Sequence, residues 1–332
     1  MRKDVFELKV NLLASASVVG KKESAGPLGP LFDLRDEDDR FGKKTWESAE
    51  SEMQRIAFNT LLAKSEKKEN EIDALFAGDL QNQCVGSAYG LMDFNIPYFG
   101  LYGACSTCAE GILLASMAIA SGCRYACSVT SSHNCVAERQ YRSPLEYGAQ
   151  RAPTAQWTVT GAGAFLLGKE ERGAARISRG CAGRVIEMGV RDLANMGAAM
   201  APAALDTLLR FFSATGERPE VYDCIVTGDL GFEGGAILQD LARAEGIPLG
   251  KRYTDCGQLI YDRETQDVHA GGSGCGCSAV VLSAYLLPKL SSGKWRRILF
   301  LSTGAMMSPD SIKQGRAIPA IAHLIELEAI PE

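Results

Sequence analysis

The sequence predicts an α/β fold made of two similar halves, and three observations support this prediction. Stretches typical of strands and helices alternate along all 332 residues, which favours a parallel or mixed sheet covered by helices. A short motif occurs twice, as EIDALFAGD at 71–79 and as VYDCIVTGD at 221–229. The same element order, β-α-β-α-β-β, surrounds both copies, so we interpret the chain as a duplicated unit. Chance similarity between two generic α/β units is the alternative.

The first half begins with an apolar stretch, LKVNLLASASVV, that predicts a strand. A helix is expected next, because apolar residues recur at spacings of three and four. The repeated motif then forms a second strand, a helix of small residues leads to a third, and another apolar strand ends this half. The expected ranges, in this order, are 8–19, 45–63, 71–79, 106–121, 125–132 and 157–168.

The second half repeats the same order of elements. We assign the two halves to residues 1–170 and 171–332. Two long connections, 20–44 and 133–156, are expected to lie on the surface, where loops of this length usually serve function or contact partners. The expected ranges in the second half are 174–190, 201–214, 221–229, 277–290, 296–303 and 317–327.

Charge and composition exclude several classes of protein. The chain carries 35 Lys and Arg against 40 Asp and Glu, and this mild acidity argues against a general nucleic-acid binder. Neither a signal peptide nor an apolar run of transmembrane length is evident. Eleven cysteines are an odd number and too few for a disulfide scaffold, so we expect mostly free thiols in a reducing compartment.

The strongest local motif is GACSTCAEG at 103–111. Apolar residues that favour a strand precede it, and a helix rich in small residues follows. This order places Cys105 at a helix start, where free N–H groups and a partial positive charge lower the pKa of a thiol. Cys105 is therefore a candidate reactive thiol, with Ser106 at the cap. The alternative is that Cys105 is a small buried apolar residue.

Cys105 and Cys108 also form a C-x-x-C pair, a spacing found in redox and zinc sites. A structural zinc site needs two further ligands, and Cys275 and Cys277 have the wrong spacing for that role. We therefore expect no metal site and leave the roles of Cys108, Cys275 and Cys277 open. Cys256 is expected to mark the counterpart of the Cys105 motif in the second half.

The strand–GACST–helix segment, the duplicated halves and a Gly-rich segment in the second half resemble the thiolase superfamily. More closely, the chain resembles the stage V sporulation AD family of spore-forming bacteria, through LFAGDLQNQ, GLYGACSTCAEG, RAPTAQWTVTGAGA, TDCGQLIYD and VHAGGSGCGCSAVV. This resemblance covers essentially the whole chain. It implies a thiolase-like fold, which is a layered αβαβα sandwich, and a homodimer.

The resemblance also tests whether the chain is an enzyme. Condensing enzymes of the superfamily combine a Cys nucleophile with two His or Asn groups from the second half. Cys105 matches the nucleophile, but the segment 227–235 has neither His nor Asn. His269 is the remaining candidate, although the GHP pattern typical of thiolases is missing around it. A Cys without such partners catalyses acyl transfer poorly, so we expect the fold without the enzymatic activity.

The sporulation family implies a ligand, dipicolinic acid, alone or as its calcium chelate, for uptake into the developing spore. No other cofactor is expected. The resemblance assigns the pocket to Asp79, Cys105 and Ser106, and a helix start is a suitable site for a carboxylate. Arginines can bind carboxylates in a bidentate manner, and solvated loop charges are the alternative reading. The candidates, all in the second long connection, are Arg139, Arg142 and Arg151.

The resemblance further implies a cytoplasmic protein attached peripherally to the forespore inner membrane. Attachment would come from membrane-embedded sporulation proteins of the same transport system. Two other functions stay open: an acyl-CoA thiolase or ketosynthase that uses Cys105, and a structural scaffold of a membrane transport complex. An acyl group trapped on Cys105 would favour the enzyme, and a closed cleft near Ser106 would favour the scaffold.

Overall fold

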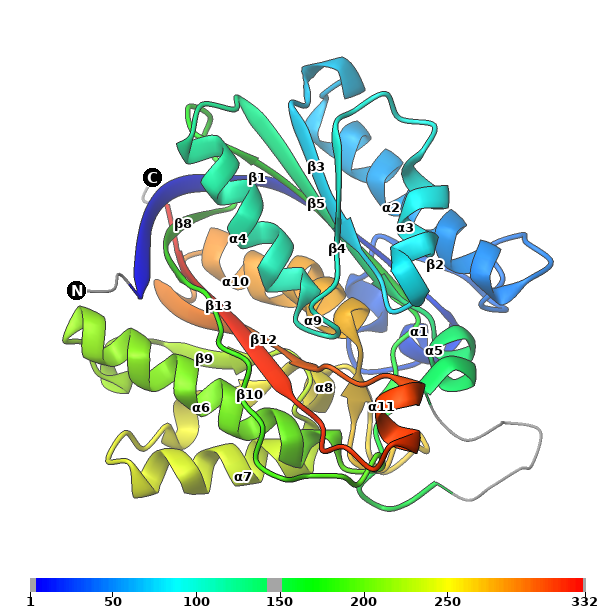
Figure 1. The fold of residues 1–332 in the computed structure, drawn as a ribbon. Coiled ribbons are helices and arrows are strands. Elements are labelled where there is room, and N and C mark those ends of the chain that lie inside the picture. Colours follow the sequence, from blue (N-terminus) through cyan, green and yellow to red (C-terminus); the bar gives the residue numbers. More distant parts are fainter. Residues whose placement is uncertain (1–3, 142–150, 331–332) are drawn as a thin grey trace.

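The computed structural model describes residues 4–141 and 151–330. Within this part of the chain, eleven strands form one sheet (Figure 1). They are β1 (Val5–Val19), β2 (Leu34–Arg35), β3 (Ala74–Gly78), β4 (Tyr98–Leu101), β5 (Tyr125–Ser132), β7 (Gly161–Gly168), β8 (Ala175–Cys181), β9 (Cys224–Thr227), β10 (Tyr253–Asp255), β12 (Arg297–Ala305) and β13 (Ala320–Glu328). Two short strands, β6 (Trp157–Thr158) and β11 (Gly272–Ser273), pair separately.

The helices differ widely in length, and the longest ones lie on the faces of the sheet. They are α1 (Lys21–Ser24), α2 (Trp46–Ser65), α3 (Val85–Leu91), α4 (Thr107–Ala120), α5 (Asn134–Tyr141), α6 (Met196–Thr215), α7 (Gly231–Ala244), α8 (Cys256–Leu259), α9 (Cys275–Val281), α10 (Leu287–Ser291) and α11 (Pro309–Lys313). A π-helical turn at Leu282–Leu286 joins α9 to α10. No helix in the described part of the chain is long and apolar enough to cross a membrane.

The strand order repeats from each edge of the sheet to its centre. One series is β4-β3-β5-β7-β1 and the other is β10-β9-β12-β13-β8, and the two match element by element. At the centre, β1 pairs antiparallel with β8, from Val5 opposite Cys181 to Leu12 opposite Ala175. This order agrees with a duplicated unit. The division into residues 1–170 and 171–332 stays an interpretation of that repeat.

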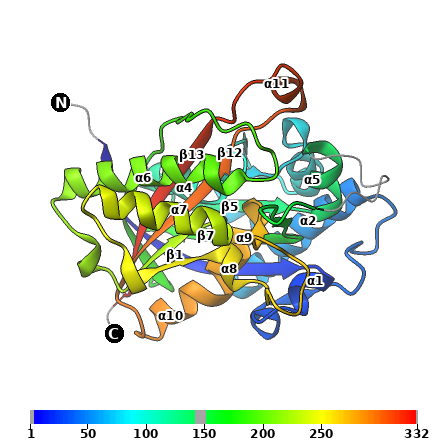
Figure 2. The same cartoon turned by 90° about the horizontal axis from the view of Figure 1, so that it is seen from below.

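Helices cover the sheet in layers, as expected for an αβαβα sandwich. The α2 helix packs on the outer face of the first series of strands, and α6 packs on the outer face of the second. The α4 and α9 helices lie between the two series, in the largest apolar cluster. Figure 2, seen from below, shows α6 and α7 side by side over the strands. The predicted fold is therefore confirmed.

Alternating side chains explain why strands fit between two helical layers. In β12, Ile298 and Phe300 face the central helices, whereas Leu299 and Leu301 face α6. Side chains that alternate between faces are a property of any strand. Because both faces are apolar here, the strand is buried on both sides, as in other parallel and mixed sheets.

The structure departs from the sequence prediction in several connections. The expected surface loop at 20–44 contains α1 and β2, and its residues Glu23, Leu28 and Phe32 are buried. The second connection begins with α5 instead of a loop. The strand predicted at 157–168 is two strands that belong to different sheets.

Candidate functional site

Cys105 lies where the chain turns from β4 into α4, as the motif predicts. The turn passes through Ala104, whose backbone φ of 51° is in the left-handed region. The Thr107 hydroxyl donates to the Ala104 carbonyl at 2.7 Å and accepts from the Gly103 N–H at 3.0 Å. These bonds fix the turn before the first helical residue and hold the Cys105 thiol in one place.

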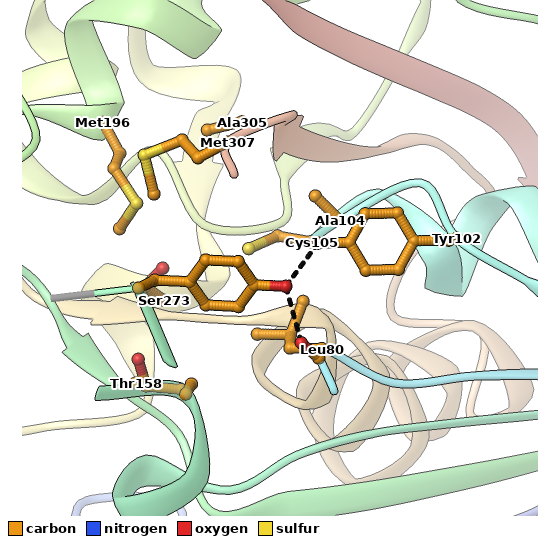
Figure 3. A pocket seen from close by; sticks show the side chains of 11 residues that line it. Leu80, Tyr102, Ala104, Cys105, Thr158, Met196, Ser273, Ala305 and Met307 are labelled. Atoms are coloured by element: carbon orange, nitrogen blue, oxygen red, sulfur yellow. Dashed lines mark hydrogen bonds between the residues drawn. The ribbon is translucent and has the colours of Figure 1, made fainter. Parts of the chain in front are cut away.

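A narrow cavity lies next to Cys105 and has a volume of about 30 Å³, roughly the space that one water occupies. Figure 3 shows Met196 and Met307 on one side of it and Tyr102 on the other, with Cys105 between them. None of the lining side chains in the described part of the chain carries a positive charge. The lining consists of Leu80, Tyr102, Ala104, Cys105, Ala137, Tyr141, Thr158, Met196, Ser273, Ala305 and Met307.

Two tyrosines bridge this cavity. The hydroxyls of Tyr102 and Tyr141 lie 2.6 Å apart, and Tyr141 donates to the carbonyl of Leu80 at 2.7 Å. Tyr102 must therefore be the donor to Tyr141. Burial raises the pKa of Tyr102 to about 12 and also raises the pKa of Tyr141, so both hydroxyls stay neutral phenols at physiological pH.

A carboxylate from the second half of the chain, that of Asp229, lies next to Cys105. Asp229 is buried and accepts hydrogen bonds from the Thr303 hydroxyl at 2.7 Å, the Gly274 N–H at 2.9 Å and the Ser273 hydroxyl at 3.2 Å. Its carboxylate also contacts the Cys105 thiol, and burial raises the pKa of Asp229 to about 6.

The expected low thiol pKa at the helix start is wrong. Burial, followed by the charge of Asp229, raises the pKa of Cys105 well above its ordinary value. Desolvation and a nearby carboxylate both disfavour a thiolate, and together they outweigh the partial positive charge of the helix end. At neutral pH the Cys105 side chain is a neutral thiol.

Asp79 and Ser106 lie beside the cavity but do not line it. The Asp79 carboxylate accepts from the Gln81 N–H at 2.7 Å and from both the N–H and the hydroxyl of Ser87, at 2.6 and 2.5 Å. It thereby holds the start of α3. The Ser106 hydroxyl donates back to the Gly103 carbonyl at 2.6 Å. Of the three implied pocket residues, only Cys105 faces the cavity.

The structure does not bring His269 to Cys105. The Nδ1 atom of His269 is 2.8 Å from the Ala152 carbonyl, and its Nε2 atom is 3.0 Å from Asp267. His269 lines a different, open pocket with Pro153 and Arg263.

Two of the three candidate arginines, Arg139 and Arg151, do not line the cavity. Arg139, on α5, pairs with Glu47, and Arg151 pairs with Asp267 at 2.8 Å. Arg142 lies outside the described residues.

All eleven cysteines are free, so the C-x-x-C pair is not a disulfide. Cys108 is buried inside α4, and Cys275 packs against Cys105 at the start of α9. Cys256 begins α8 directly after β10. Among residues 4–141 and 151–330, no group of three or more His, Cys, Asp or Glu side chains is arranged to hold a metal ion.

Sequence reasoning missed Asp229, Ser273 and the two tyrosines. A signal for Asp229 was present, because the repeated motif places it after β9 as it places Asp79 after β3. The superfamily pattern predicts His or Asn in the segment 227–235, and Asp229 is a carboxylate instead.

Comparison with solved structures identifies the fold. The 3-oxoacyl-[acyl-carrier-protein] synthase III of Aquifex aeolicus VF5 aligns with a TM-score of 0.57 and 12% identity, over 96% of this chain and 99% of that one. OleA of Xanthomonas campestris aligns with a TM-score of 0.56 and 16% identity, over 98% of each chain. Both are condensing enzymes of the thiolase-like type, and at this identity they show the fold alone.

Sequence comparison goes further. The chain is 41% identical to stage V sporulation protein AD of Bacillus subtilis (strain 168) over 325 residues, which cover 98% of this chain and 96% of that protein. The family model of stage V sporulation protein AD (SpoVAD) matches residues 2–328. The chain therefore belongs to the stage V sporulation protein AD family, and it carries this family's sequence on a thiolase-like fold.

Proposed function

We propose that this sporulation protein binds dipicolinic acid in the cavity beside Cys105 and serves its uptake into the developing spore. One observation carries the proposal: the cavity occupies the helix start of a thiolase-like fold, but neutral phenols, methionines and a neutral thiol surround it. Such a lining suits a flat aromatic ring, because Tyr102 and Tyr141 offer ring faces and Met196 and Met307 adapt their shape.

The cavity must widen to admit this ligand. Its volume of about 30 Å³ is far below the roughly 300–1,000 Å³ of typical ligand pockets. Met196 and Met307 have unbranched side chains that change conformation readily. Tyr141 is held by hydrogen bonds to Leu80 and Tyr102, which an incoming carboxylate can replace.

Titration calorimetry with dipicolinate tests the proposal. We expect heat at millimolar ligand and weaker binding by the double variant Cys105→Ala plus Asp79→Ala, since Cys105 contacts the cavity and Asp79 holds the segment that carries Leu80. The variant His269→Ala is the matched control and should bind normally. No heat with the unmodified chain, or unchanged affinity in the double variant, would refute the proposal.

We further propose that the chain does not transfer acyl groups. The observation behind this is that burial, together with the charge of Asp229, keeps the Cys105 thiol neutral, whereas an acyl-transfer nucleophile must be activated. Incubation with acyl-CoA followed by mass spectrometry of the intact chain tests it. We expect no added acyl mass, and an acyl group on Cys105 would establish the enzymatic alternative.

A structural scaffold is the second candidate function, and the small volume of the cavity favours it. A scaffold needs no ligand, so we would expect little open space at the start of α4. The calorimetric titration separates the two, because a scaffold gives no saturable heat with dipicolinate at any concentration.

We also propose that the chain forms a homodimer along β4. This strand is the edge of the sheet in the described chain, and edge strands pair readily with another strand. Large apolar side chains surround it: Phe99 is 52% exposed, and Tyr89 and Met92 are 67% and 68% exposed. A second copy can cover them by strand pairing. Phe99→Asp should give monomers in light scattering, and an unchanged mass would refute this.

Membrane attachment and calcium complete the proposal. We propose that the chain binds peripherally at the forespore inner membrane through membrane-embedded sporulation proteins, and that calcium, where present, arrives with the ligand. Pull-down from spore-forming cells, with and without carbonate extraction, tests attachment.

Titration of dipicolinate with and without Ca²⁺ tests whether calcium arrives with the ligand. We expect similar affinities in the two titrations.

A further inference from the structure

In the part of the chain that the structure describes, the cavity beside Cys105 lacks the groups that usually neutralise a carboxylate. None of the described lining residues is Lys, Arg or His. The hydroxyl groups of the lining already donate to acceptors in the protein. These donations run from Tyr102 to Tyr141, from Tyr141 to the Leu80 carbonyl, from Thr158 to Glu138 at 3.3 Å and from Ser273 to Asp229 at 3.2 Å. Among the described residues, an entering anion therefore meets no cation, and it gains a hydroxyl proton only by replacing one of these hydrogen bonds, such as that from Tyr141 to Leu80.

The carboxylate of Asp229 makes the cavity still less favourable for an anion. Ser273 lines the cavity, and its hydroxyl contacts Asp229. A ligand carboxylate bound to the same hydroxyl would lie within about 6 Å of Asp229, the length of two hydrogen bonds. Two carboxylates this close in a buried site do not both stay ionised.

We propose that Asp229 takes up one proton when a dicarboxylate binds, and that this proton offsets part of the negative charge that the ligand brings next to Asp229. The inference rests on the proposed function, and it makes Asp229 a specificity-determining residue. The proton comes from solvent and binds Oδ2 of Asp229. That oxygen then donates to Ser273, whose own hydroxyl proton turns to the ligand, and no other bond forms or breaks.

The surroundings of Asp229 fit this role. Thr303 and the Gly274 N–H hold the carboxyl group in place in either state. Burial raises the pKa of Asp229 to about 6, and a ligand carboxylate bound this close raises it further, because two adjacent buried carboxylates do not both ionise.

Other titratable groups face Asp229 from the neighbouring elements. Cys105 lies before α4, Asp255 ends β10, and Cys256 and Cys277 come from α8 and α9. Burial raises the pKa of all three thiols well above the ordinary value, so they stay neutral. Burial raises the pKa of Asp255 to about 7, but this carboxylate is held by the N–H groups of Leu230 and Gly231 and does not line the cavity.

Calorimetry in two buffers counts the protons. The full chain is titrated with dipicolinate at about pH 7.5 in phosphate and in Tris, whose heats of ionisation differ, and in phosphate from about pH 6 to 8 for the pH dependence. We expect uptake of close to one proton at pH 7.5 and a Kd that rises up to tenfold per pH unit above the Asp229 pKa. Asp229→Asn should bind without uptake and with little pH dependence. Glu23→Gln removes a buried carboxyl with a pKa near 7 in α1 and should keep the uptake.

Each outcome decides between the two proposals. Equal heats in both buffers and a pH-independent Kd overturn the inference and leave ligand binding intact. Uptake that persists in a folded Asp229→Asn variant, checked by its melting temperature, also overturns it. The proton count of the unmodified chain tests the inference even if the Asp229→Asn variant does not fold. Absence of binding at every pH refutes the proposed function and the inference together.

Discussion

Glu50 and Asp79 are both held by Gln81, whose side-chain amide donates to Glu50 at 3.0 Å and whose backbone N–H donates to Asp79 at 2.7 Å. Both carboxyl groups are buried. Burial, followed by the charge of Asp79, raises the pKa of Glu50 to about 8. One proton is therefore shared within this pair at neutral pH. Leu80, which borders the cavity beside Cys105, lies in the segment that this pair anchors.

The Glu50 proton makes stability depend on pH. In the unfolded chain Glu50 ionises near its ordinary pKa, whereas the folded chain keeps it protonated up to about pH 8. Its contribution to stability is thus fully present below pH 4.5 and is lost as the pH rises, by up to about 1.4 kcal/mol per unit. Glu50→Gln should flatten this slope in urea unfolding. The control Glu52→Gln, on the same helix, should keep it, and a slope that survives in Glu50→Gln would contradict the assignment.

Cys105 should react slowly with alkylating reagents. Its thiol stays neutral because of burial and Asp229, and only the thiolate is nucleophilic. We expect slower labelling by iodoacetamide at pH 7.5 than for the partly exposed Cys123, measured by peptide mass spectrometry. Asp229→Asn should speed the labelling of Cys105. Faster reaction of Cys105 than of Cys123 in the unmodified chain would show an activated thiol.

Gly304 should be intolerant of any side chain. A Cβ there would lie 2.3 Å from the Gly103 carbonyl oxygen and 2.9 Å from the Ser106 nitrogen. Because both are backbone atoms, Gly304→Ala must displace the turn that carries Cys105, at a cost of about 1–3 kcal/mol. The control Gly100→Ala meets only the Tyr98 side chain, at 3.4 Å. Equal stability of both variants in chemical denaturation would show that the turn adapts freely.

Glu326 should be important for stability. Its side chain is fully buried and accepts from Arg179 at 2.5 Å and from Arg297. Burial alone would raise the pKa of Glu326, but hydrogen bonds from Arg179, Ser178 and Arg297 lower it below the ordinary value. Its stabilisation is therefore present at neutral pH and is lost as acid protonates it.

Glu326→Gln should destabilise the chain by about 3–5 kcal/mol, because two arginines lose their buried partner. Glu328→Gln is the matched control on the same strand, where the side chain is 32% exposed and lies 3.4 Å from Arg297. We expect a change of about 1 kcal/mol or less for this exposed pair. Similar losses for both variants in urea unfolding would contradict the prediction.

Much of the strand pattern was predictable because it depends on local composition. The strand predicted at 125–132 matches β5 at both ends. The α7 helix was missed because its first turns contain Gly231, Gly234 and Gly235, and glycine disfavours helices. The structure explains this composition: a Cβ at Gly234 would lie 2.7 Å from the Cα of Gly197 in α6. The close packing of α6 against α7 requires glycine at this position, although glycine has a low helix propensity.

Strand pairing between segments far apart in the sequence limited the prediction elsewhere. The predicted strand 157–168 divides because Trp157 and Thr158 pair with Gly272 and Ser273, which lie far along the chain. Nothing in the local sequence marks that partner.

The same limit applies to the site. The motif located Cys105, but the pKa direction depended on burial and on Asp229, which comes from the other half of the chain. A local pattern describes the helix end and not the groups that the fold brings to it. For this reason the position of the thiol was predicted correctly and its chemical state was not.

The pairing of β1 with β8 has a consequence for synthesis on the ribosome. The first strand to emerge remains half unpaired until residues 175–181 follow, and α4 stays uncovered on the face that α9 later covers. A nascent chain stalled before β8 would thus expose apolar surface, and we expect chaperones to bind it there. The first half therefore reaches its packed state only when the second half has been synthesised and folds against it.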